Sequence, residues 1–127
     1  MHVLFVDDFF ETRDLFRLGF GLQGHTMETA HNGKEALRIL AQSTGNLDLV
    51  IIDYHMPEMD GLELVRQLRR KEIASIPVIL LTGSSRGLLE DEALLLGVAR
   101  VVYKPILPAD LITIAQEVIN FRQHPVA

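Results

Sequence analysis

Acidic residues of this 127-residue chain lie where short apolar runs end. Asp7 and Asp8 follow a run at 2–6, and Asp53 follows a run at 47–52. Carboxylates crowded together raise one another's pKa unless a cation compensates. Oxygen-only ligands suit Mg²⁺, with Mn²⁺ as an alternative, and a carboxylate can also attack phosphorus as a nucleophile. The three aspartates therefore indicate a metal-dependent phosphoryl site.

Two more apolar runs end in residues that suit the same chemistry. Thr82 follows a run at 77–81 and offers a hydroxyl, while Lys104 follows a run at 100–103 and offers an ammonium group. Phosphoryl transfer depends mainly on positioning and on neutralising charge at the phosphoryl oxygens. Thr82, Lys104 and a divalent cation would supply both around an attacking Asp53.

Strands and helices must alternate along the chain to bring these residues together. The predicted strands are the apolar runs at 2–6, 26–30, 47–52, 77–81 and 100–103. The third and fourth are continuously apolar, as in parallel strands covered on both faces. Alternation with helices through right-handed crossovers gives a doubly wound α/β fold. Ligands of such folds bind beyond the carboxyl ends of the strands, where the strand order reverses.

Helix-end signals and apolar spacing predict helices between the strands. Leu15, Leu18 and Leu22 have helical spacing within 10–22, a helix that Gly24 can end. The other signals are Asn32 as the cap of a helix from 33 to about 42, the capping-box pair Asp60 and Glu63, and Pro108 at a first helical position.

Composition narrows the class of protein. With 48% apolar residues in 14.3 kDa, we expect a single domain over 1–127 with its core at about 2–122. The absence of cysteine excludes disulfides and thiolate zinc sites. A formal net charge of -5 argues against direct nucleic-acid binding. No apolar run approaches the roughly 20 residues of a membrane helix, so we expect a cytoplasmic protein without membrane association.

Four motifs together resemble the receiver domains of bacterial two-component response regulators. They are Val6-Asp7-Asp8, the segment DYHMPEMDG that begins at Asp53, Leu81-Thr82-Gly83 and Tyr103-Lys104-Pro105. The resemblance implies a flavodoxin-like (βα)5 fold, with five parallel strands in the order 2-1-3-4-5. It also implies a signalling module that accepts a phosphoryl group from a histidine kinase or phosphotransfer protein and acts on a downstream effector. Such a module catalyses only its own phosphorylation and dephosphorylation, so we do not expect a conventional enzyme.

The resemblance assigns the metal-binding and phosphoryl-accepting roles. Asp53 would accept the phosphoryl group and share Mg²⁺ with Asp8. Asp7 would act mostly through a metal-bound water, and the backbone carbonyl of His55 would complete the protein ligands.

The resemblance assigns further roles around the phosphoryl group. Thr82 and Lys104 would each contact a phosphoryl oxygen. The Lys104–Pro105 peptide bond would be cis, which a prolyl bond permits at modest cost. Gly83 meets the family's requirement for a small residue beside the site. The side chains of Ser84 and His55 would occupy positions that tune dephosphorylation. The alternative for His55 is a solvated loop histidine.

The switch region departs from the family pattern. Many receivers have an aromatic residue three positions before the lysine, where this chain has Val101. Tyr103 lies on the same strand face and could replace that aromatic residue. The alternative is a tyrosine that packs at the strand end with its hydroxyl in water.

The last third of the chain is unusually apolar. In and around its two predicted helices lie Leu88, Leu89, Leu94, Leu95, Leu96, Ile112, Ile114 and Phe121. One amphipathic helix face cannot bury all of them in a small domain, and exposed apolar patches usually mark interfaces. We therefore expect a homodimer or partner contact on the face formed by these helices and the strand between them. The alternative is wide burial of these residues under the sheet.

Two other functions stay open. A pseudo-receiver would keep the fold as an interaction module without phosphorylation, and Mg²⁺-dependent labelling by acetyl phosphate separates it from an active receiver. A phosphohydrolase resembling the haloacid dehalogenases would use Asp53 as a transient nucleophile. That family has a second aspartate two residues later, where this chain has His55.

Overall fold

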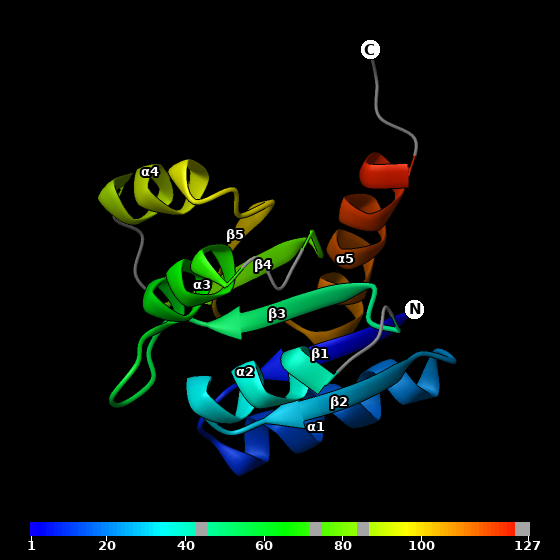
Figure 1. The fold of residues 1–127 in the computed structure, drawn as a ribbon. Coiled ribbons are helices and arrows are strands. Elements are labelled where there is room, and N and C mark those ends of the chain that lie inside the picture. The colour runs from blue at the N-terminus through cyan, green and yellow to red at the C-terminus, as the bar shows by residue number, and fades with distance from the viewer. Residues whose placement is uncertain (43–45, 72–74, 84–86, 124–127) are drawn as a thin grey trace.

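The computed structural model describes residues 1–42, 46–71, 75–83 and 87–123. It contains a five-stranded parallel sheet that is covered by helices on both faces (Figure 1). The strands are β1 (His2–Val6), β2 (Thr26–Ala30), β3 (Leu49–Asp53), β4 (Val78–Thr82) and β5 (Arg100–Tyr103). The helices are α1 (Phe10–Leu22), α2 (Gly33–Gln42), α3 (Gly61–Arg70), α4 (Gly87–Leu95) and α5 (Pro108–Gln123). The order β2-β1-β3-β4-β5 confirms the predicted flavodoxin-like sheet.

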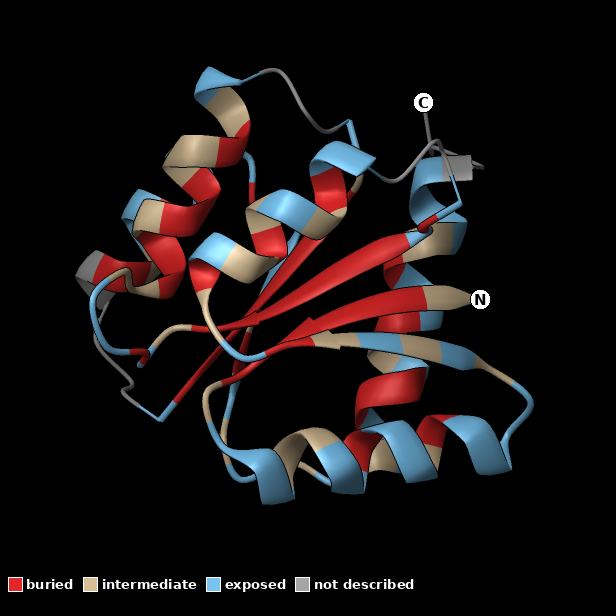
Figure 2. Ribbon diagram, turned by 60° about the horizontal axis from the view of Figure 1, so that its bottom comes forward, coloured by how far each residue is buried: buried red, intermediate tan, exposed pale blue. Residues whose placement is uncertain are grey.

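The core has two halves, one on each face of the sheet. Successive side chains of a strand point to opposite faces, so Leu4 and Val6 pack with residues of α2, α3 and α4. Val3 and Phe5 pack with residues of α1 and α5. Every residue of β3 and β4 is buried, as their continuous apolar runs predict (Figure 2). The sheet is therefore a rigid base for the residues at its strand ends.

The strands β3 and β4 begin and end one or two residues later than predicted. Pro77 has no N–H to donate and lies outside β4, whereas Asp53 pairs with Leu81 in the parallel ladder. Asp53 and Thr82 are consequently the last residues of their strands, not the first residues of loops. Backbone pairing thus restrains both residues more tightly than a loop would.

The predicted helix ends are confirmed by their hydrogen bonds. The side chain of Asn32, which precedes α2, accepts a hydrogen bond from the N–H of Glu35 in the first turn of α2 at 2.8 Å. The Asp60 side chain accepts the N–H of Glu63 at 2.9 Å and caps α3. Pro108 is the first residue of α5, where its missing N–H costs nothing.

The helix α1 spans the predicted residues, but aromatic side chains set its buried face. Its exposed leucines are Leu15, Leu18 and Leu22, at 54%, 63% and 79%. Phe16 and Phe20 are buried instead, and Phe16 stacks on Phe5 of β1 with ring centroids 5.0 Å apart. Gly19 allows α5 to approach, because a Cβ there would lie 2.5 Å from the Cβ of Pro108. The aromatic contacts and this close helix approach leave the leucines outside.

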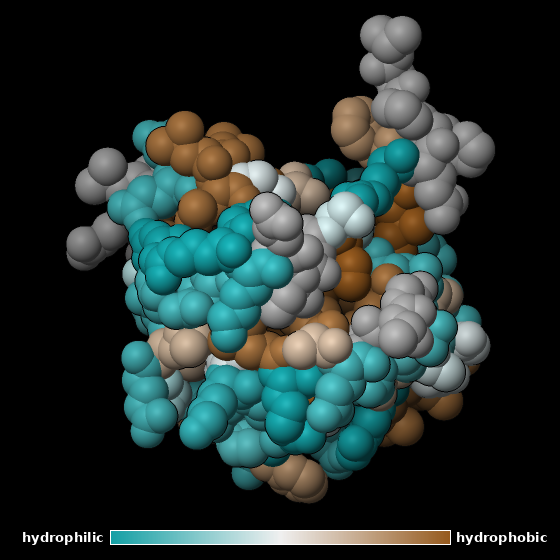
Figure 3. Space-filling view, in the orientation of Figure 1, coloured by the Kyte–Doolittle hydropathy of each residue, from teal (hydrophilic) through white to brown (hydrophobic). Residues whose placement is uncertain are grey.

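The apolar last third is only partly buried. Leu89 and Ile112 belong to the core, whereas Leu94, Leu95 and Phe121 are 64%, 88% and 64% exposed. Figure 3 shows apolar surface gathered over α4. The side chain of Leu88 lies outside those that the structure describes. Within the described ranges, no helix is both long and apolar enough to cross a membrane.

Gly61, the first residue of α3, lies against the end of β3. A Cβ there would be 2.8 Å from the backbone oxygen of Asp53 and 2.9 Å from the Cα of Tyr54. We expect Gly61→Ala to lower the free energy of unfolding by about 1–3 kcal/mol through overpacking, as measured by urea denaturation. Gly21→Ala in α1 is the matched control, because a Cβ there would meet no atom of another part of the described chain within 4 Å. An equal loss in both variants would contradict the steric explanation.

Candidate functional site

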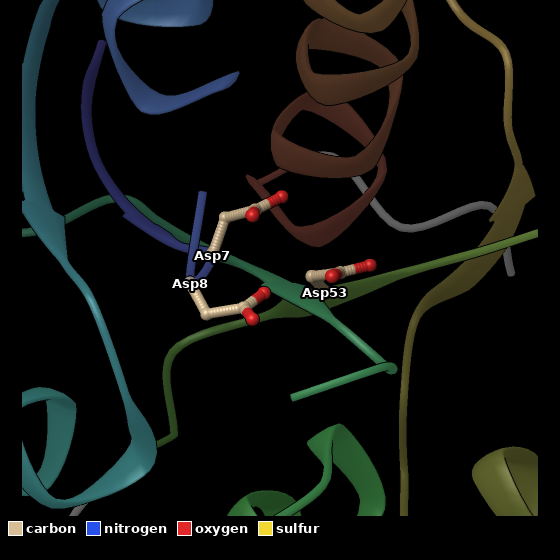
Figure 4. Close-up of side chains that lie close together, drawn as sticks. All are labelled: Asp7, Asp8 and Asp53. Atoms are coloured by element: carbon tan, nitrogen blue, oxygen red, sulfur yellow. The ribbon is translucent and has the colours of Figure 1, made fainter. Parts of the chain in front are cut away.

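Three carboxylates converge at the carboxyl ends of β1 and β3 (Figure 4). One oxygen each of Asp7, Asp8 and Asp53 lies within 4.8 Å of the other two. The side chains of Asp7 and Asp53 are buried, and Asp8 is partly buried. The chain leaves β1 for β2 on one side and later forms β3 on the other, so the cluster lies where the strand order reverses.

Lys104 brings a positive charge to the cluster. Its Nζ lies 3.0 Å from Asp53 Oδ1 and 3.5 Å from Asp7 Oδ2. The N–H of Lys104 donates to the carbonyl of Thr82 at 2.8 Å, which ties the end of β5 to the end of β4. Thr82 is fully buried there. The Lys104–Pro105 peptide bond is cis, as the resemblance implies.

The pKa shifts of the site reflect burial first and then the charges of neighbouring groups. Burial raises the pKa of Asp53, and the charges of Asp7 and Asp8 raise it further, while Lys104 opposes them. Burial alone would lower the pKa of Lys104, but its interactions with Asp53 and Asp7 raise it overall. One ammonium group therefore faces three carboxylates, and a divalent cation would relieve the remaining repulsion.

The environment of the Asp8 carboxylate fits a bound cation. Its Oδ1 is buried and has no hydrogen-bond partner among the residues that the structure describes. A buried carboxylate oxygen without a donor is costly, and a cation would satisfy it. Asp7 is already engaged, because its Oδ1 accepts the N–H of Phe9 at 2.9 Å and its Oδ2 faces Lys104. The hard oxygen donors of this cluster fit Mg²⁺.

The remaining predicted residues surround this centre to different degrees. The exposed His55 ring packs edge-on against Tyr54, with centroids 4.8 Å apart. Gly83 is exposed, and a Cβ there would meet no atom of the described residues within 4 Å. Val101 is partly buried and packs against the core under α2, α3 and α4. Ser84 lies outside the described residues.

The side chain of Tyr103 is exposed at the end of β5, and its hydroxyl also contacts α4. The hydroxyl donates a hydrogen bond to the carboxylate of Glu90 in α4. This bond is the main cause of the raised pKa of Tyr103. Tyr103 is the last residue of β5 and its side chain reaches α4, a contact that the sequence alone did not indicate.

Sequence reasoning also missed Arg13 beside the acidic cluster. Its Nη1 donates to the backbone carbonyl of Asp7 at 2.8 Å. One signal was available: Arg13 is the fourth residue of α1, near a helix N-terminus where positive charge is unfavourable.

The fold and the site define a doubly wound α/β domain with an acidic centre at its switch point, the architecture of signalling receivers. The model of the response regulator receiver domain matches residues 3–116. The chain therefore belongs to the response regulator receiver domain family, which is generally a non-enzymatic signalling module.

Relatives of known sequence agree with this family. The chain is 36% identical over 110 residues to the probable transcriptional regulator ycf27 of Cyanidium caldarium, covering 87% of this chain and 43% of the relative. It is 32% identical over 111 residues to the response regulator SaeR of Staphylococcus aureus, covering 87% and 47%. The chain thus spans about half the length of the curated relatives it matches.

Solved structures agree with the fold and the family. The receiver domain of the Francisella response regulator 1452 has a TM-score of 0.86 and 29% identity, covering 95% of this chain and 98% of that one. The chemotaxis protein CheY4 of Vibrio cholerae has a TM-score of 0.85 and 30% identity, covering 92% and 97%.

Proposed function

We propose that this chain accepts a phosphoryl group on Asp53 in a Mg²⁺-dependent reaction and transmits a conformational signal. The observation that supports this function is the convergence of three carboxylates within 4.8 Å, with the Lys104 ammonium 3.0 Å from Asp53. Membership of the receiver family adds independent support. The alternative of a pseudo-receiver shares the fold but predicts no phosphorylation.

In the proposed reaction, a carboxylate oxygen of Asp53 attacks the phosphorus of a phosphohistidine. The new O–P bond forms as the P–N bond breaks, and the imidazole leaves with the electron pair and takes up a proton from solvent. With acetyl phosphate, a P–O bond breaks instead and acetate leaves. Lys104 then pairs with one phosphoryl oxygen, and the Thr82 hydroxyl donates to another.

The residues proposed to hold Mg²⁺ are Asp8 and Asp53 directly, the backbone carbonyl of His55, and Asp7 through a bound water. When bound, the cation would neutralise both the carboxylates and the charge that develops on the phosphoryl oxygens. Mn²⁺ would serve in the same oxygen-ligand site.

The proposed partners are a histidine kinase or phosphotransfer protein as donor and a downstream effector protein as target. This assignment is supported by relatives and neighbours that are themselves response regulators and chemotaxis proteins. Exposed Leu94, Leu95 and Phe121 support an association surface on the α4–β5–α5 face, where a homodimer stays a prediction. Direct binding of nucleic acid is still not expected, given the net charge of -5.

We propose that Tyr103 links the phosphorylation site to α4. Thr82 and Tyr103 are paired across β4 and β5, and Lys104 follows Tyr103 directly. Movement of Thr82 and Lys104 toward a phosphoryl group would displace Tyr103 and weaken its hydrogen bond to Glu90. Among the described side chains of α4, Leu89 and Ala93 are the buried ones, and a helix held by few buried contacts responds to such a loss.

Tyr103→Phe is expected to loosen α4 before phosphorylation, because it removes the hydroxyl but keeps the ring. Loss of this hydrogen bond should speed amide hydrogen exchange in the described part of α4. Tyr54→Phe, at the chain's only other tyrosine, is the matched control and should leave this exchange unchanged. Unchanged exchange in Tyr103→Phe would refute the proposed link.

Incubation with acetyl phosphate and Mg²⁺ tests the proposed function directly. We expect the intact protein to gain one phosphoryl group, detected by mass spectrometry. A chain that gains none, while a receiver of known activity is labelled in parallel, would be a pseudo-receiver. Steady hydrolysis of many phosphate esters without a stable labelled protein would instead indicate a phosphohydrolase.

A further inference from the structure

A tight turn after β1 presents Asp8 to the acidic cluster. The N–H of Asp7 donates to the carbonyl of Ala30 at 3.1 Å, and Asp7 Oδ1 accepts the N–H of Phe9 at 2.9 Å across the turn. Arg13 completes the turn by donating from Nη1 to the Asp7 carbonyl at 2.8 Å. Asp8 lies between these fixed points with its Oδ1 unpartnered among the described residues.

The bond from Arg13 acts on Asp8 through the peptide plane. The carbonyl of Asp7 and the N–H and Cα of Asp8 lie in one planar unit. A restraint on the Asp7 oxygen therefore also restrains the N–Cα bond of Asp8, from which its side chain projects. Arg13 itself lies over the Phe10 ring, with its guanidinium carbon 5.9 Å from the ring centroid.

The position of Arg13 is unfavourable for α1 itself. A positive charge near a helix N-terminus opposes the helix dipole, and the bond to Asp7 offsets this cost. Arg17, one turn later, has an ordinary local role, because it pairs with the exposed Asp14 at 2.5 Å. The two arginines of α1 thus differ in what they contact, although both belong to the same helix.

We infer that Arg13 is a positioning residue for the divalent cation, a role that rests on the proposed metal site. It sets the Asp7–Asp8 peptide so that the unpartnered Asp8 oxygen points to where the cation binds. Partners that orient metal ligands typically contribute 10- to 100-fold to metal affinity. Arg13→Ala should therefore weaken Mg²⁺ binding about tenfold or more, while Asp8 and Asp53 remain in place.

Isothermal titration calorimetry, with Mg²⁺ added to the metal-free protein, tests this role. The melting temperature of each metal-free variant is measured in parallel. Binding is compared at a temperature where all variants are folded. We expect weaker binding in Arg13→Ala and near wild-type binding in Arg17→Ala. Arg13→Lys should recover most of the affinity, because a single donor to the Asp7 carbonyl is required.

Three results would overturn the inference. The first is a Mg²⁺ affinity of Arg13→Ala equal to that of wild type, even if the melting temperature of the variant falls. The second is an equal loss of Mg²⁺ affinity in Arg17→Ala, and the third is no recovery of affinity in Arg13→Lys. If wild type bound no Mg²⁺, the metal site of the proposed function would fail and the inference with it. If wild type bound Mg²⁺ and Arg13→Ala bound it equally well, the inference alone would fail.

Discussion

Asp53→Asn is expected to abolish labelling by acetyl phosphate, while wild type gains one phosphoryl group under the same conditions. The amide oxygen keeps the shape of the side chain and can still accept a hydrogen bond from Lys104, but it cannot form the acyl phosphate. Asp60→Asn is the matched control. Asn serves as well as Asp at a helix N-cap, so the cap of α3 should survive and labelling should stay at the wild-type level.

Asp53→Asn should also change how the stability of the fold depends on pH, and this change can be measured only if the variant folds. The pKa of Asp53 is raised in the metal-free fold, mainly by burial. The carboxyl group of Asp53 therefore binds its proton more tightly in the folded chain than in the unfolded chain. Stability is therefore lost as the pH rises from the ordinary aspartate range through the raised pKa. Asp53→Asn should lack this loss, whereas persistent labelling of the variant would place the acceptor elsewhere.

Removal of the divalent cation should slow labelling of wild type at least about 100-fold. A metal ion contributes several kcal/mol of charge stabilisation to such transfers, and about 2.7 kcal/mol corresponds to a factor of 100. Asp8→Ala should show a comparable loss in the presence of Mg²⁺, because its buried Oδ1 has no hydrogen-bond partner among the described residues. The rate is measured from the phosphorylated fraction over time by mass spectrometry.

A matched variant separates loss of the metal site from loss of negative charge. Asp14→Ala removes a carboxylate that is exposed on α1 and paired with Arg17. We expect its labelling rate to stay within about twofold of wild type, a change of about 0.4 kcal/mol in activation free energy, because this carboxylate lies outside the acidic cluster. Full labelling of wild type in excess chelator would contradict metal dependence.

The sequence predicts the convergence of the site because strand ends have fixed places in a parallel sheet. Asp7, Asp53, Thr82 and Lys104 each end a strand or follow one directly, and the carboxyl ends of parallel strands meet at one edge. The order of the strands came from the family resemblance, and the structure confirms it. The chemical roles of these residues stay predictions until phosphorylation is measured.

Contacts between side chains and distant backbone or helices could not be predicted in this way. The bond from Arg13 to the Asp7 carbonyl depends on the angle at which α1 leaves β1. The bond from Tyr103 to Glu90 depends on how α4 packs against β5. Helical spacing located α1, but stacking of Phe16 on β1 decided which face is buried. Such choices are made by tertiary packing, which apolar periodicity does not encode.

Borohydride reduction of the labelled protein, followed by peptide mapping, tests the central claim most directly. Hydride reduces an aspartyl phosphate to homoserine and releases phosphate, so it marks the acceptor residue. We predict homoserine at position 53 in wild type that has been labelled by acetyl phosphate in the presence of Mg²⁺, and no homoserine in Asp53→Asn. Homoserine at another aspartate, or a phosphoryl group that resists reduction, would contradict the assignment of Asp53 as the acceptor.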